Sequence, residues 1–377
     1  MDKHLHIVSF NVPWLADYGG VIDVFYRLKA LSEAGVKIHL HCFTYGRPEA
    51  PELERYCEEV CYYRRNMSPL KFLDHRPFIV SSRDNKALRR RLSQDSYPIL
   101  IEGLHCCSLL EYDNLLQNRL VMVRAHNVEA DYYARLAASE KNLWRKAYLK
   151  IEASRISRYE PILTRASAVL AISQGDKEKL ERLRCRNVLL VSASHQYSVT
   201  QSPSYSGTPY ALYQGDLTVA DNYNAAARLI NNVFADGRHP LVVAGKEPPE
   251  WLKELVAQHT NVTLVPSPDE ATMQRLIAGA QVNVLLSSQA TGLKLKLLNA
   301  LFAGGHCLVN SAMVQGSGLD SLCHVADTDE ALRQQLDTLM TTPFDEAQIA
   351  TRQAILQPYL TVNAIKPILE ILSCNSL

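Results

Sequence analysis

Short apolar runs alternate with longer amphipathic stretches along most of the 377-residue chain. The runs are rich in Val, Ile and Leu, and they predict strands that are buried on both faces of a parallel sheet. Apolar residues at helical spacing between the runs predict helices that cover this sheet. The pattern therefore predicts an α/β chain of Rossmann-like units, whose ligands bind at the carboxyl ends of the strands. The expected strands are 4–10, 36–43, 59–63, 99–101, 120–124, 168–172, 188–191, 210–214, 241–244, 262–265, 282–286 and 307–309.

The clearest interruption of this pattern lies at residues 201–209, where Ser, Pro, Gly and Thr replace the apolar positions. Such a composition is typical of a linker, and a chain of this length is most simply two domains. We therefore expect one α/β domain over residues 1–200 and a second over 208–357, followed by a helical tail over 358–377.

Bulk composition narrows the class of protein. A net charge of +1 leaves no excess of cations for a dedicated nucleic-acid binder. The nine cysteines lack paired Cys-x-x-Cys spacing, and several fall in apolar strands, which favours reduced thiols in a cytoplasmic protein. No apolar run approaches the 18 or so residues of a membrane-spanning helix. The one Asp-x-Asp, at 327–329, is better explained as helix capping than as a metal site, so we expect no metal.

The stretch between the strands 282–286 and 307–309 is a candidate phosphate site. Thr291 and Gly292 stand where an amphipathic helix is expected to begin, and a helix start favours an anion. Lys294 and Lys296 follow in its expected first turn, where cations are unfavourable unless an anion compensates them. Asn299 lies two turns further along. A surface helix with solvated lysines explains the same spacing equally well.

Polar residues also follow the strands of the first half. Gly19 and Gly20 permit a close backbone approach at the start of a helix, and Asp23 lies in the first turn of that helix. An acid at a helix start needs no further function. The segments 102–105 and 125–129 end two other strands and bring polar side chains to the expected ligand edge.

Residues 291–305 resemble the nucleotide-sugar site of GT-B glycosyltransferases, in particular the retaining family four. Ala300 and Gly304 match an A-x-x-x-G pattern of that family, and residues 292–296, Gly-Leu-Lys-Leu-Lys, look like a lysine-rich version of its glycine turn. The resemblance makes Leu293 part of the donor site. Two glutamates that the family spaces eight residues apart are here Thr291 and Asn299. An amide can still hydrogen-bond a ribose, although without the charge.

A second match lies at residues 124–129, Arg-Ala-His-Asn-Val-Glu, which resemble the H-N-x-E segment of family four. The resemblance implies that His126 contacts the donor sugar near the reacting carbon and that Glu129 is a neighbour at the helix start. It also makes Gly215 and Lys246 donor-binding residues beside the diphosphate, with Gly20 approaching donor and acceptor. Asp216 departs from the family, which often has an arginine near this position.

The resemblance implies a GT-B fold, with two Rossmann-like domains facing across a cleft and the tail helix crossing back to the first domain. It implies a metal-independent, retaining hexosyltransferase of bacterial type that uses a UDP- or GDP-linked sugar and a glycan or lipid-linked acceptor. His126 and Asp23 are the catalytic candidates. The basic stretch 83–91 is interpreted as a solvated helix face or as a foothold on the inner face of an anionic membrane. A catalytically impaired scaffold is the alternative function, and a sugar-nucleotide epimerase is a weaker one.

Overall fold

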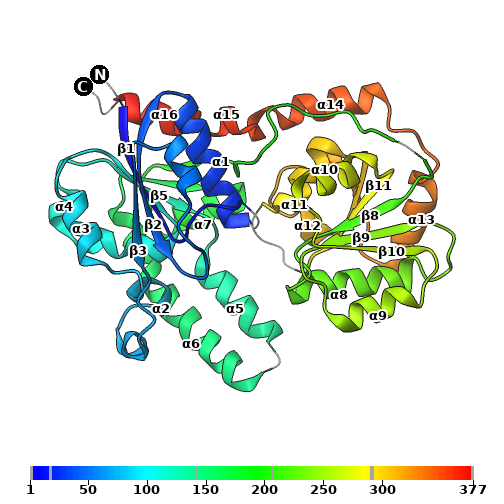
Figure 1. The fold of residues 1–377 in the computed structure, drawn as a ribbon, viewed down its shortest axis with the longest axis horizontal. Coiled ribbons are helices and arrows are strands. Elements are labelled where there is room, and N and C mark those ends of the chain that lie inside the picture. The colour runs from blue at the N-terminus through cyan, green and yellow to red at the C-terminus, as the bar shows by residue number, and fades with distance from the viewer. Residues whose placement is uncertain (1–2, 17–18, 141, 206, 289–292, 375–377) are drawn as a thin grey trace. The chain divides into compact units, whose positions relative to one another are not determined.

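The computed structural model describes residues 3–16, 19–140, 142–205, 207–288 and 293–374. The chain divides into two compact units (Figure 1). The first unit combines residues 1–196 with residues 361–377, and the second comprises residues 197–360.

The first unit contains a parallel sheet with strand order β3-β2-β1-β4-β5-β6-β7. The strands coincide closely with the apolar runs of the sequence. β1 pairs with β2 on one side and with β4 on the other. The strands are β1 Lys3–Ser9, β2 Val36–Thr44, β3 Glu59–Arg64, β4 Ile99–Glu102, β5 Val121–Ala125, β6 Ala168–Ala171 and β7 Val188–Leu190. The α-helices are α1 Gly19–Glu33, α2 Phe78–Ser81, α3 Lys86–Leu92, α4 Asp113–Leu116, α5 Glu129–Ser139, α6 Leu143–Tyr159 and α7 Gln174–Arg182. Four 3₁₀ segments, η1 Pro51–Arg55, η2 Pro69–Leu73, η3 Leu104–Glu111 and η4 Glu160–Arg165, complete the unit before its tail.

Apolar side chains fill both faces of this sheet. Successive residues of a strand point to opposite faces, so Ile7 belongs to one buried cluster and Val8 to the other. Leu100 and Ile101 of β4 divide in the same way. This double burial explains why the strands are continuous apolar runs in the sequence.

The tail completes one of these two clusters. It forms α15 Thr361–Ala364 and α16 Lys366–Cys374, and its Ile365, Ile368 and Leu372 are buried with the residues of β1 and β2. The Thr361 hydroxyl accepts a hydrogen bond from the His195 amide at 2.9 Å and donates one to the His195 carbonyl at 2.8 Å. These contacts fix the tail on the first unit.

The charged, helix-prone pattern of residues 130–163 favours one long helical region, and the structure differs from that expectation. The structure has two α-helices, α5 and α6, followed by η4. α6 starts anew because Asn142 caps it, its side chain accepting hydrogen bonds from the amides of Trp144 and Arg145. The two helices then pack against each other as a hairpin.

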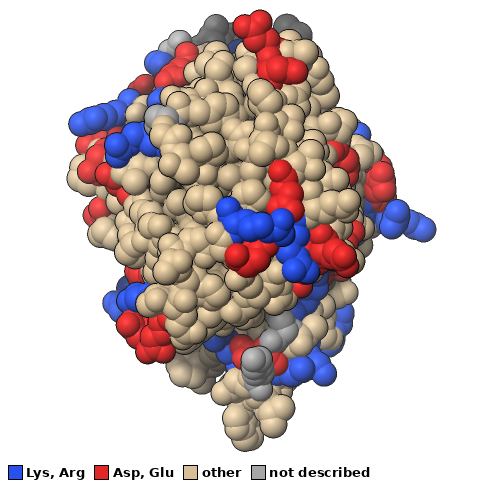
Figure 2. Space-filling model, turned by 90° about the vertical axis from the view of Figure 1, so that its right-hand side faces the viewer, with Lys and Arg blue, Asp and Glu red and all other residues tan. Residues whose placement is uncertain are grey.

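The second unit contains a parallel sheet with strand order β10-β9-β8-β11-β12-β13. Its strands are β8 Ala211–Gln214, β9 Leu241–Gly245, β10 Val262–Pro266, β11 Val282–Leu285, β12 His306–Val309 and β13 His324–Val325. Its α-helices are α8 Ala220–Arg228, α9 Glu250–Ala257, α10 Glu270–Gly279, α11 Leu295–Ala303, α12 Ser311–Val314, α13 Asp329–Leu339 and α14 Glu346–Leu356. The shorter segments are the π-helix Leu229–Val233 after α8 and the 3₁₀ turns Asp320–Leu322 and Gln357–Tyr359. Figure 2 shows cationic and anionic side chains side by side on one face of the molecule, in keeping with the small net charge.

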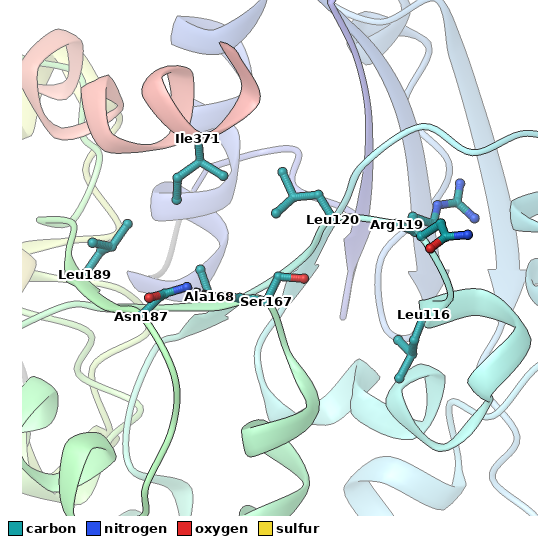
Figure 3. Close-up of a pocket in the computed structure, with 9 residues that line it drawn as sticks. Leu116, Arg119, Leu120, Ser167, Ala168, Asn187, Leu189 and Ile371 are labelled. Atoms are coloured by element: carbon teal, nitrogen blue, oxygen red, sulfur yellow. Dashed lines mark hydrogen bonds between the residues drawn. The ribbon is translucent and has the colours of Figure 1, made fainter. Parts of the chain in front are cut away.

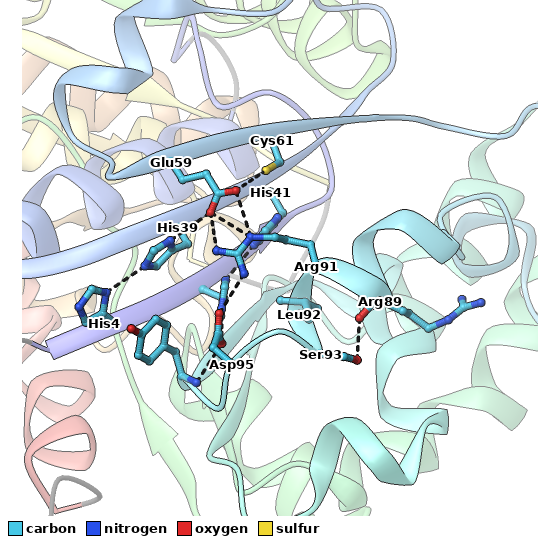
Figure 4. Close-up of polar contacts among 12 residues, drawn as sticks. His4, His39, His41, Glu59, Cys61, Arg89, Arg91, Leu92, Ser93 and Asp95 are labelled. Atoms are coloured by element: carbon cyan, nitrogen blue, oxygen red, sulfur yellow. Dashed lines mark hydrogen bonds and ion pairs between the residues drawn. The ribbon is translucent and has the colours of Figure 1, made fainter.

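Four histidines of β1 and β2 form a hydrogen-bonded set on one side of the first sheet (Figure 4). His6 bonds Asp95 through Nε2 and His41 through Nδ1, each at 2.9 Å, while His4 Nδ1 bonds His39 Nε2 at the same distance. A carboxylate only accepts hydrogen bonds, so neutral His6 carries its proton on Nε2 and His41 donates to its Nδ1. Burial, which outweighs the bond with Asp95, lowers the pKa of His6 to about 4.

Candidate functional site

Strand order locates the expected ligand site of each unit. In an open parallel sheet, the crevice lies where strand order reverses, at the carboxyl ends of the two strands involved. The first sheet reverses between β1 and β4, and the second between β8 and β11. Polar side chains gather at both of these places.

Five charged or titratable side chains form one buried cluster at the β1/β4 crevice, here called the charged cluster: Asp23, Arg27, Glu102, Arg124 and His126. Arg27 Nη1 donates to Asp23 Oδ1 at 2.9 Å, and its Nη2 donates to Glu102 Oε2 at 2.7 Å. Arg124 Nε donates to Asp23 Oδ2 at 3.0 Å. His126 lies between the two carboxylates, with Nδ1 3.3 Å from Asp23 Oδ2 and Nε2 2.9 Å from Glu102 Oε2.

Two carboxylates and two guanidinium groups of this cluster balance each other's charge while buried away from solvent. Asp23, Arg27, Glu102 and Arg124 are each at most 1% exposed. Burial alone would raise the pKa of Asp23, but the charges of Arg124 and Arg27 outweigh it and hold the pKa far below its ordinary value. Burial likewise acts to raise the pKa of Glu102, and the charge of Arg27 outweighs it, so this carboxyl also stays ionised. The cluster therefore holds the His126 ring between the two carboxylates, with Nε2 hydrogen-bonded to Glu102.

A glycine and an aromatic ring complete the surroundings of His126. Gly103 has φ 75°, and a Cβ there would stand 3.0 Å from His105 Nδ1 and 3.6 Å from His126 Cδ2. The ring of Phe10 meets the His126 ring edge-on at 5.4 Å. Phe10 also touches Gly20, where an added Cβ would lie 2.9 Å from its ring. Gly20 therefore lets α1 start close to Phe10 and His126, and this position is consistent with its expected place at the site.

Glu129 lies apart from the charged cluster. It is buried at the start of α5, and burial together with the charge of Glu160 raises its pKa to about 8. Glu160 accepts a hydrogen bond from the Ala130 amide at 3.0 Å. The pair of acids therefore supports the start of α5, directly after the strand end that carries His126.

Lys296 occupies the β8/β11 crevice of the second unit. Its Nζ donates to Asn222 Oδ1 at 2.9 Å and to the Leu286 carbonyl at 3.1 Å, and it lies over the Tyr213 ring at 5.4 Å. Gln214 Nε2 donates to the backbone carbonyl of Lys296 at 3.0 Å. Burial lowers the pKa of Lys296 to about 8. A lysine at this pKa is mostly a cation at neutral pH, held by neutral oxygens.

A second set of hydrogen bonds joins the two strand ends at this crevice. Asp221 accepts from the Ser287 hydroxyl at 3.0 Å and from the Ser288 amide at 2.8 Å. Asp221 also acts to raise the pKa of Lys296, against the effect of burial.

Gly215 and Lys246 lie at neighbouring strand ends, after β8 and β9. Gly245 packs so closely that a Cβ on it would stand 1.9 Å from the Gly215 carbonyl oxygen, so only glycine fits. The Leu217 amide donates to the Lys246 carbonyl at 3.1 Å, and Lys246 itself is exposed. The carboxylate of Asp216 accepts a hydrogen bond from the Thr218 hydroxyl, two residues further along, at 2.6 Å.

The expected helix start at Thr291 and Gly292 needs correction. Both residues lie outside the described residues, and α11 begins at Leu295 with Lys294 in extended conformation at its N-cap. Within the helix the buried apolar face runs from Leu297, and Leu293 is buried one turn earlier without being helical. Lys294 Nζ donates to the Ala312 carbonyl at 3.0 Å. Leu293 is buried in front of the helix and Asn299 is half-buried within it.

The basic stretch 83–91 is not a freely accessible cationic surface. Arg83 is buried and donates to the carbonyls of Phe10 and Ile79. Arg89 pairs with Asp84, and Arg91 pairs with Glu59 and Asp95. The cations of this stretch that lie on the exposed face of α3 are Lys86 and Arg90. The membrane foothold predicted here loses most of its charge because the helix uses it to hold the unit together.

A groove of about 680 Å³ lies at the opposite edge of the first sheet (Figure 3). Its lining includes residues that precede β5, β6 and β7, namely Leu120, Ser167 and Asn187, and Ile371 of α16. Arg119 also lines it, but the guanidinium already donates to the Tyr97 and Leu92 carbonyls. The groove is therefore remote from the carboxyl ends at which His126 lies.

Sequence reasoning singled out His126 and Asp23, and the structure brings them together. It did not find Arg27 or Asp221, and it brought the segment 102–105 to the ligand edge without giving Glu102 a partner or a role. The spacing of Asp23 and Arg27, four residues apart on one helix, was a readable signal for their pairing. Glu102 ends a strand, where a buried acid is unusual. Its partners depend on the strand order of the sheet, which cannot be deduced from the sequence alone.

The described residues contain no group of three or more His, Cys, Asp or Glu side chains arranged to hold a metal ion. Within the same residues, no helix is long and apolar enough to cross a membrane.

No protein-family model matches the chain. The sequence is 24% identical over 324 residues to an uncharacterized 44.6 kDa protein in the cps region of Klebsiella pneumoniae, and the match covers 78% of this chain and 79% of that protein.

Solved structures match the whole chain. Sucrose-phosphate synthase from Thermosynechococcus elongatus aligns with a TM-score of 0.71 and 16% identity, over 99% of both chains. A UDP-forming α,α-trehalose-phosphate synthase from Burkholderia vietnamiensis aligns with a TM-score of 0.63 and 10% identity, over 99% of this chain and 100% of that one. The lipopolysaccharide outer core galactosyltransferase WaaB aligns with 0.61 and 14% identity, over 100% of both. The two parallel-sheet units thus have the GT-B fold, and the fold expected from the sequence is confirmed.

Proposed function

We propose that the protein is a glycosyltransferase that moves a hexose from a nucleotide-diphosphate sugar to a glycan or glycolipid acceptor with retention of configuration. The observation that carries the proposal is the charged cluster. It places His126 and Asp23, bonded to each other, at the crevice where a GT-B unit is expected to take its ligand. A buried ionic cluster is costly to maintain, and a binding site is a reason to keep one at the strand ends.

In this proposal the second unit holds the nucleotide sugar. Lys246 and Lys294 would supply positive charge for the diphosphate, with Lys296 behind them. Gly215 would allow close backbone approach, together with Thr291 and Gly292. Anion recognition by cations and backbone amides needs no metal, so we propose a metal-independent reaction.

The first unit would orient the transferred sugar. His126, fixed by Asp23 and Glu102, would donate a hydrogen bond to a sugar hydroxyl once substrate displaces one of its carboxylate contacts. Catalysis would then consist mainly of positioning and of stabilising the leaving diphosphate. The names of the structural neighbours include a galactosyltransferase and a UDP-forming synthase, which supports a UDP- or GDP-linked hexose as the donor class.

A catalytically impaired scaffold is the second candidate, and three observations favour it. Lys296 and Lys294 already bond oxygens of the protein itself, and Asp216 brings a negative charge to the end of β8. Thr291 and Asn299 stand where the resemblance expects glutamates. Such a protein would keep the fold and lose turnover.

The test is nucleotide binding by calorimetry with UDP, GDP, ADP, CMP and dTDP, followed by donor hydrolysis with the nucleotide that binds. We expect one nucleotide to bind and Lys246→Ala to weaken it about tenfold or more, because a charge-assisted phosphate contact is lost. Lys253→Ala is the matched control, since Lys253 is an exposed lysine of the same unit that pairs with Glu250. We expect it to bind as the parent does.

The outcomes separate the candidates. Binding of a nucleotide with release of free sugar supports the transferase, and loss of that release in Asp23→Asn places the charged cluster in the reaction. Binding without turnover, or no binding at all, supports the scaffold. Conversion of the sugar without release of the nucleotide would instead indicate an epimerase.

A further inference from the structure

Large apolar side chains stand exposed at one end of the first unit. Leu143 and Trp144, at the start of α6, are 79% and 88% exposed, and Ile151 of the same helix is 56% exposed. Leu70 and Leu73 of η2 are 73% and 82% exposed. Together these five residues are called the apolar tip. Figure 1 shows that α5 and α6 project away from the sheet of this unit.

Contacts beneath the exposed side chains connect the two segments of the apolar tip, η2 and α6. The ring of Phe72 stacks on Phe78 at 4.0 Å and meets Tyr148 of α6 edge-on at 5.9 Å. Arg155 Nη1 donates to the Phe72 carbonyl at 2.9 Å, and the Phe78 amide donates to the buried carboxylate of Glu152. η2 is therefore anchored to α6 by side chains that leave Leu70 and Leu73 pointing outward. The exposure of the apolar tip is a feature of folded, supported structure.

Cations surround this apolar surface. α6 carries five basic side chains and one acidic side chain, and that acid, Glu152, is buried. Lys150 and Arg158 are exposed, Lys146 is half-buried, and Lys71 follows Leu70 in η2. Two acids next to the apolar tip in the sequence are paired: Glu140 with Arg145, and Asp74 with Arg76. At the lower end of Figure 2, uncharged side chains project beyond neighbouring charged side chains of both signs.

We propose that the apolar tip docks on the surface of an anionic phospholipid bilayer. Trp is favoured at the boundary between headgroups and acyl chains, and Leu and Ile gain by leaving water. Lys and Arg beside them are attracted by anionic headgroups. Exposed Trp and Leu side chains on segments with an excess of cations therefore match both the apolar and the anionic part of such a surface. The docking stands independently of the proposed function, and it replaces the stretch 83–91, in which Arg83, Arg89 and Arg91 are bonded within the protein.

The test is co-sedimentation of the full-length protein with large vesicles of phosphatidylcholine alone or with 30% phosphatidylglycerol, a composition chosen for the assay, at about 0.1 M salt. We expect binding to the anionic vesicles that falls as salt is raised, and at least tenfold weaker binding to the neutral ones. Leu143→Ser/Trp144→Ser should weaken binding to anionic vesicles about tenfold or more, since the two most exposed apolar side chains are removed. Lys146→Glu/Lys150→Glu should weaken it by at least as much.

The matched control is Lys86→Glu/Arg90→Glu on α3, which changes the same charge on another exposed helix of the same unit. We expect this variant to bind anionic vesicles as the parent does. Equal binding by all variants, or equal binding to both kinds of vesicle, would overturn the proposal. Concentration-dependent dimerisation that the Leu143/Trp144 variant abolishes would also overturn it, by assigning the apolar tip to a second copy of the chain. Nucleotide binding should be unchanged in every variant, so failure here leaves the proposed function standing.

Discussion

Replacing Glu102 with glutamine removes one of the two negative charges of the charged cluster while keeping the volume of the side chain. Glu102 accepts hydrogen bonds from Arg27 Nε at 3.2 Å, from Arg27 Nη2 at 2.7 Å and from His126 Nε2 at 2.9 Å. Glutamine can accept some of these bonds through its carbonyl oxygen. Its amide group, however, would turn two donors toward groups that also donate.

The expected cost follows from the balance of buried charge. Without Glu102, Asp23 is left to compensate both Arg27 and Arg124, each of which is fully buried. Removing one partner of a buried ion pair costs about 3–5 kcal/mol. A domain of this size has a free energy of unfolding of about 5–15 kcal/mol. We therefore expect Glu102→Gln to remove a large part of the stability of the first unit.

A double-mutant cycle with Arg27→Met separates lost contacts from stranded charge. Removing both partners restores the balance of charge, so the double variant should be about 2–3 kcal/mol more stable than the sum of the single changes predicts. Urea unfolding can be followed by the fluorescence of Trp14, which packs on Phe25 of the first unit. The exposed Trp144 and Trp251 are replaced by phenylalanine in all variants, so that Trp14 alone reports.

Glu140→Gln is the control for this cycle. Glu140 pairs with Arg145, whose side chain is 74% exposed, and a solvent-screened pair of this kind contributes less than about 1 kcal/mol. Two results would refute the reasoning. One is a loss below about 1 kcal/mol in Glu102→Gln, and the other is simple additivity in the double variant.

Three further predictions concern other parts of the chain. Folded His6 has a pKa of about 4 against an ordinary 6.5, so the unfolded state binds more protons between these values. His6 should therefore contribute a loss of about 3 kcal/mol as pH drops through that window. Buried His41, whose pKa is lowered to about 3, acts in the same direction. Thermal unfolding of His6→Gln should show a smaller pH dependence than the parent, whereas the exposed His75→Gln should keep the dependence of the parent. Lys296 has a pKa of about 8 in the folded state against an ordinary 10.5, so here too the unfolded state binds more protons between the two values. The stability of the second unit should therefore rise by about 3 kcal/mol from pH 8 to 10.5. Lys296→Met should abolish this rise. Gly245→Ala should destabilise by about 2 kcal/mol or more, because its Cβ has no room, whereas calorimetry of Gly175→Ala, in open space on α7, should show no loss.

Most of the fold was predictable because its strands are buried on both faces and thus appear as apolar runs. Residues 4–10, 36–43 and 282–286 were predicted as strands and lie within one or two residues of β1, β2 and β11. The two-residue β13 escaped because it is too short to leave a pattern. The break between α5 and α6 escaped because both helices carry many charged residues, although Asn142 is a recognisable cap.

The site was predictable only where chemistry coincides with a local signal. His126 follows a strand, which is a local feature; Asp23 was expected in the first turn of a helix, but α1 starts at Gly19 and Asp23 is its fifth residue. The pairing of Arg27 with Glu102 depends on β4 lying next to β1, a contact across 75 residues of chain. Lys296 was predicted to meet an anion, but no local pattern predicts that its hydrogen bonds go to Asn222 and Leu286.

The return of the tail to the first unit has a consequence for biogenesis. Ile368 and Leu372 belong to the same apolar cluster as Leu5 and Ile7 of β1, yet a ribosome makes them some 360 residues later. At about 5–20 residues per second, the first unit waits tens of seconds with part of its core uncovered. The second unit, continuous in sequence, has all of its residues before the first has its last. The part synthesised first is thus completed last, and the cluster of Leu5 and Ile7, which the tail later covers, is the apolar surface that a chaperone would have to protect in the nascent chain.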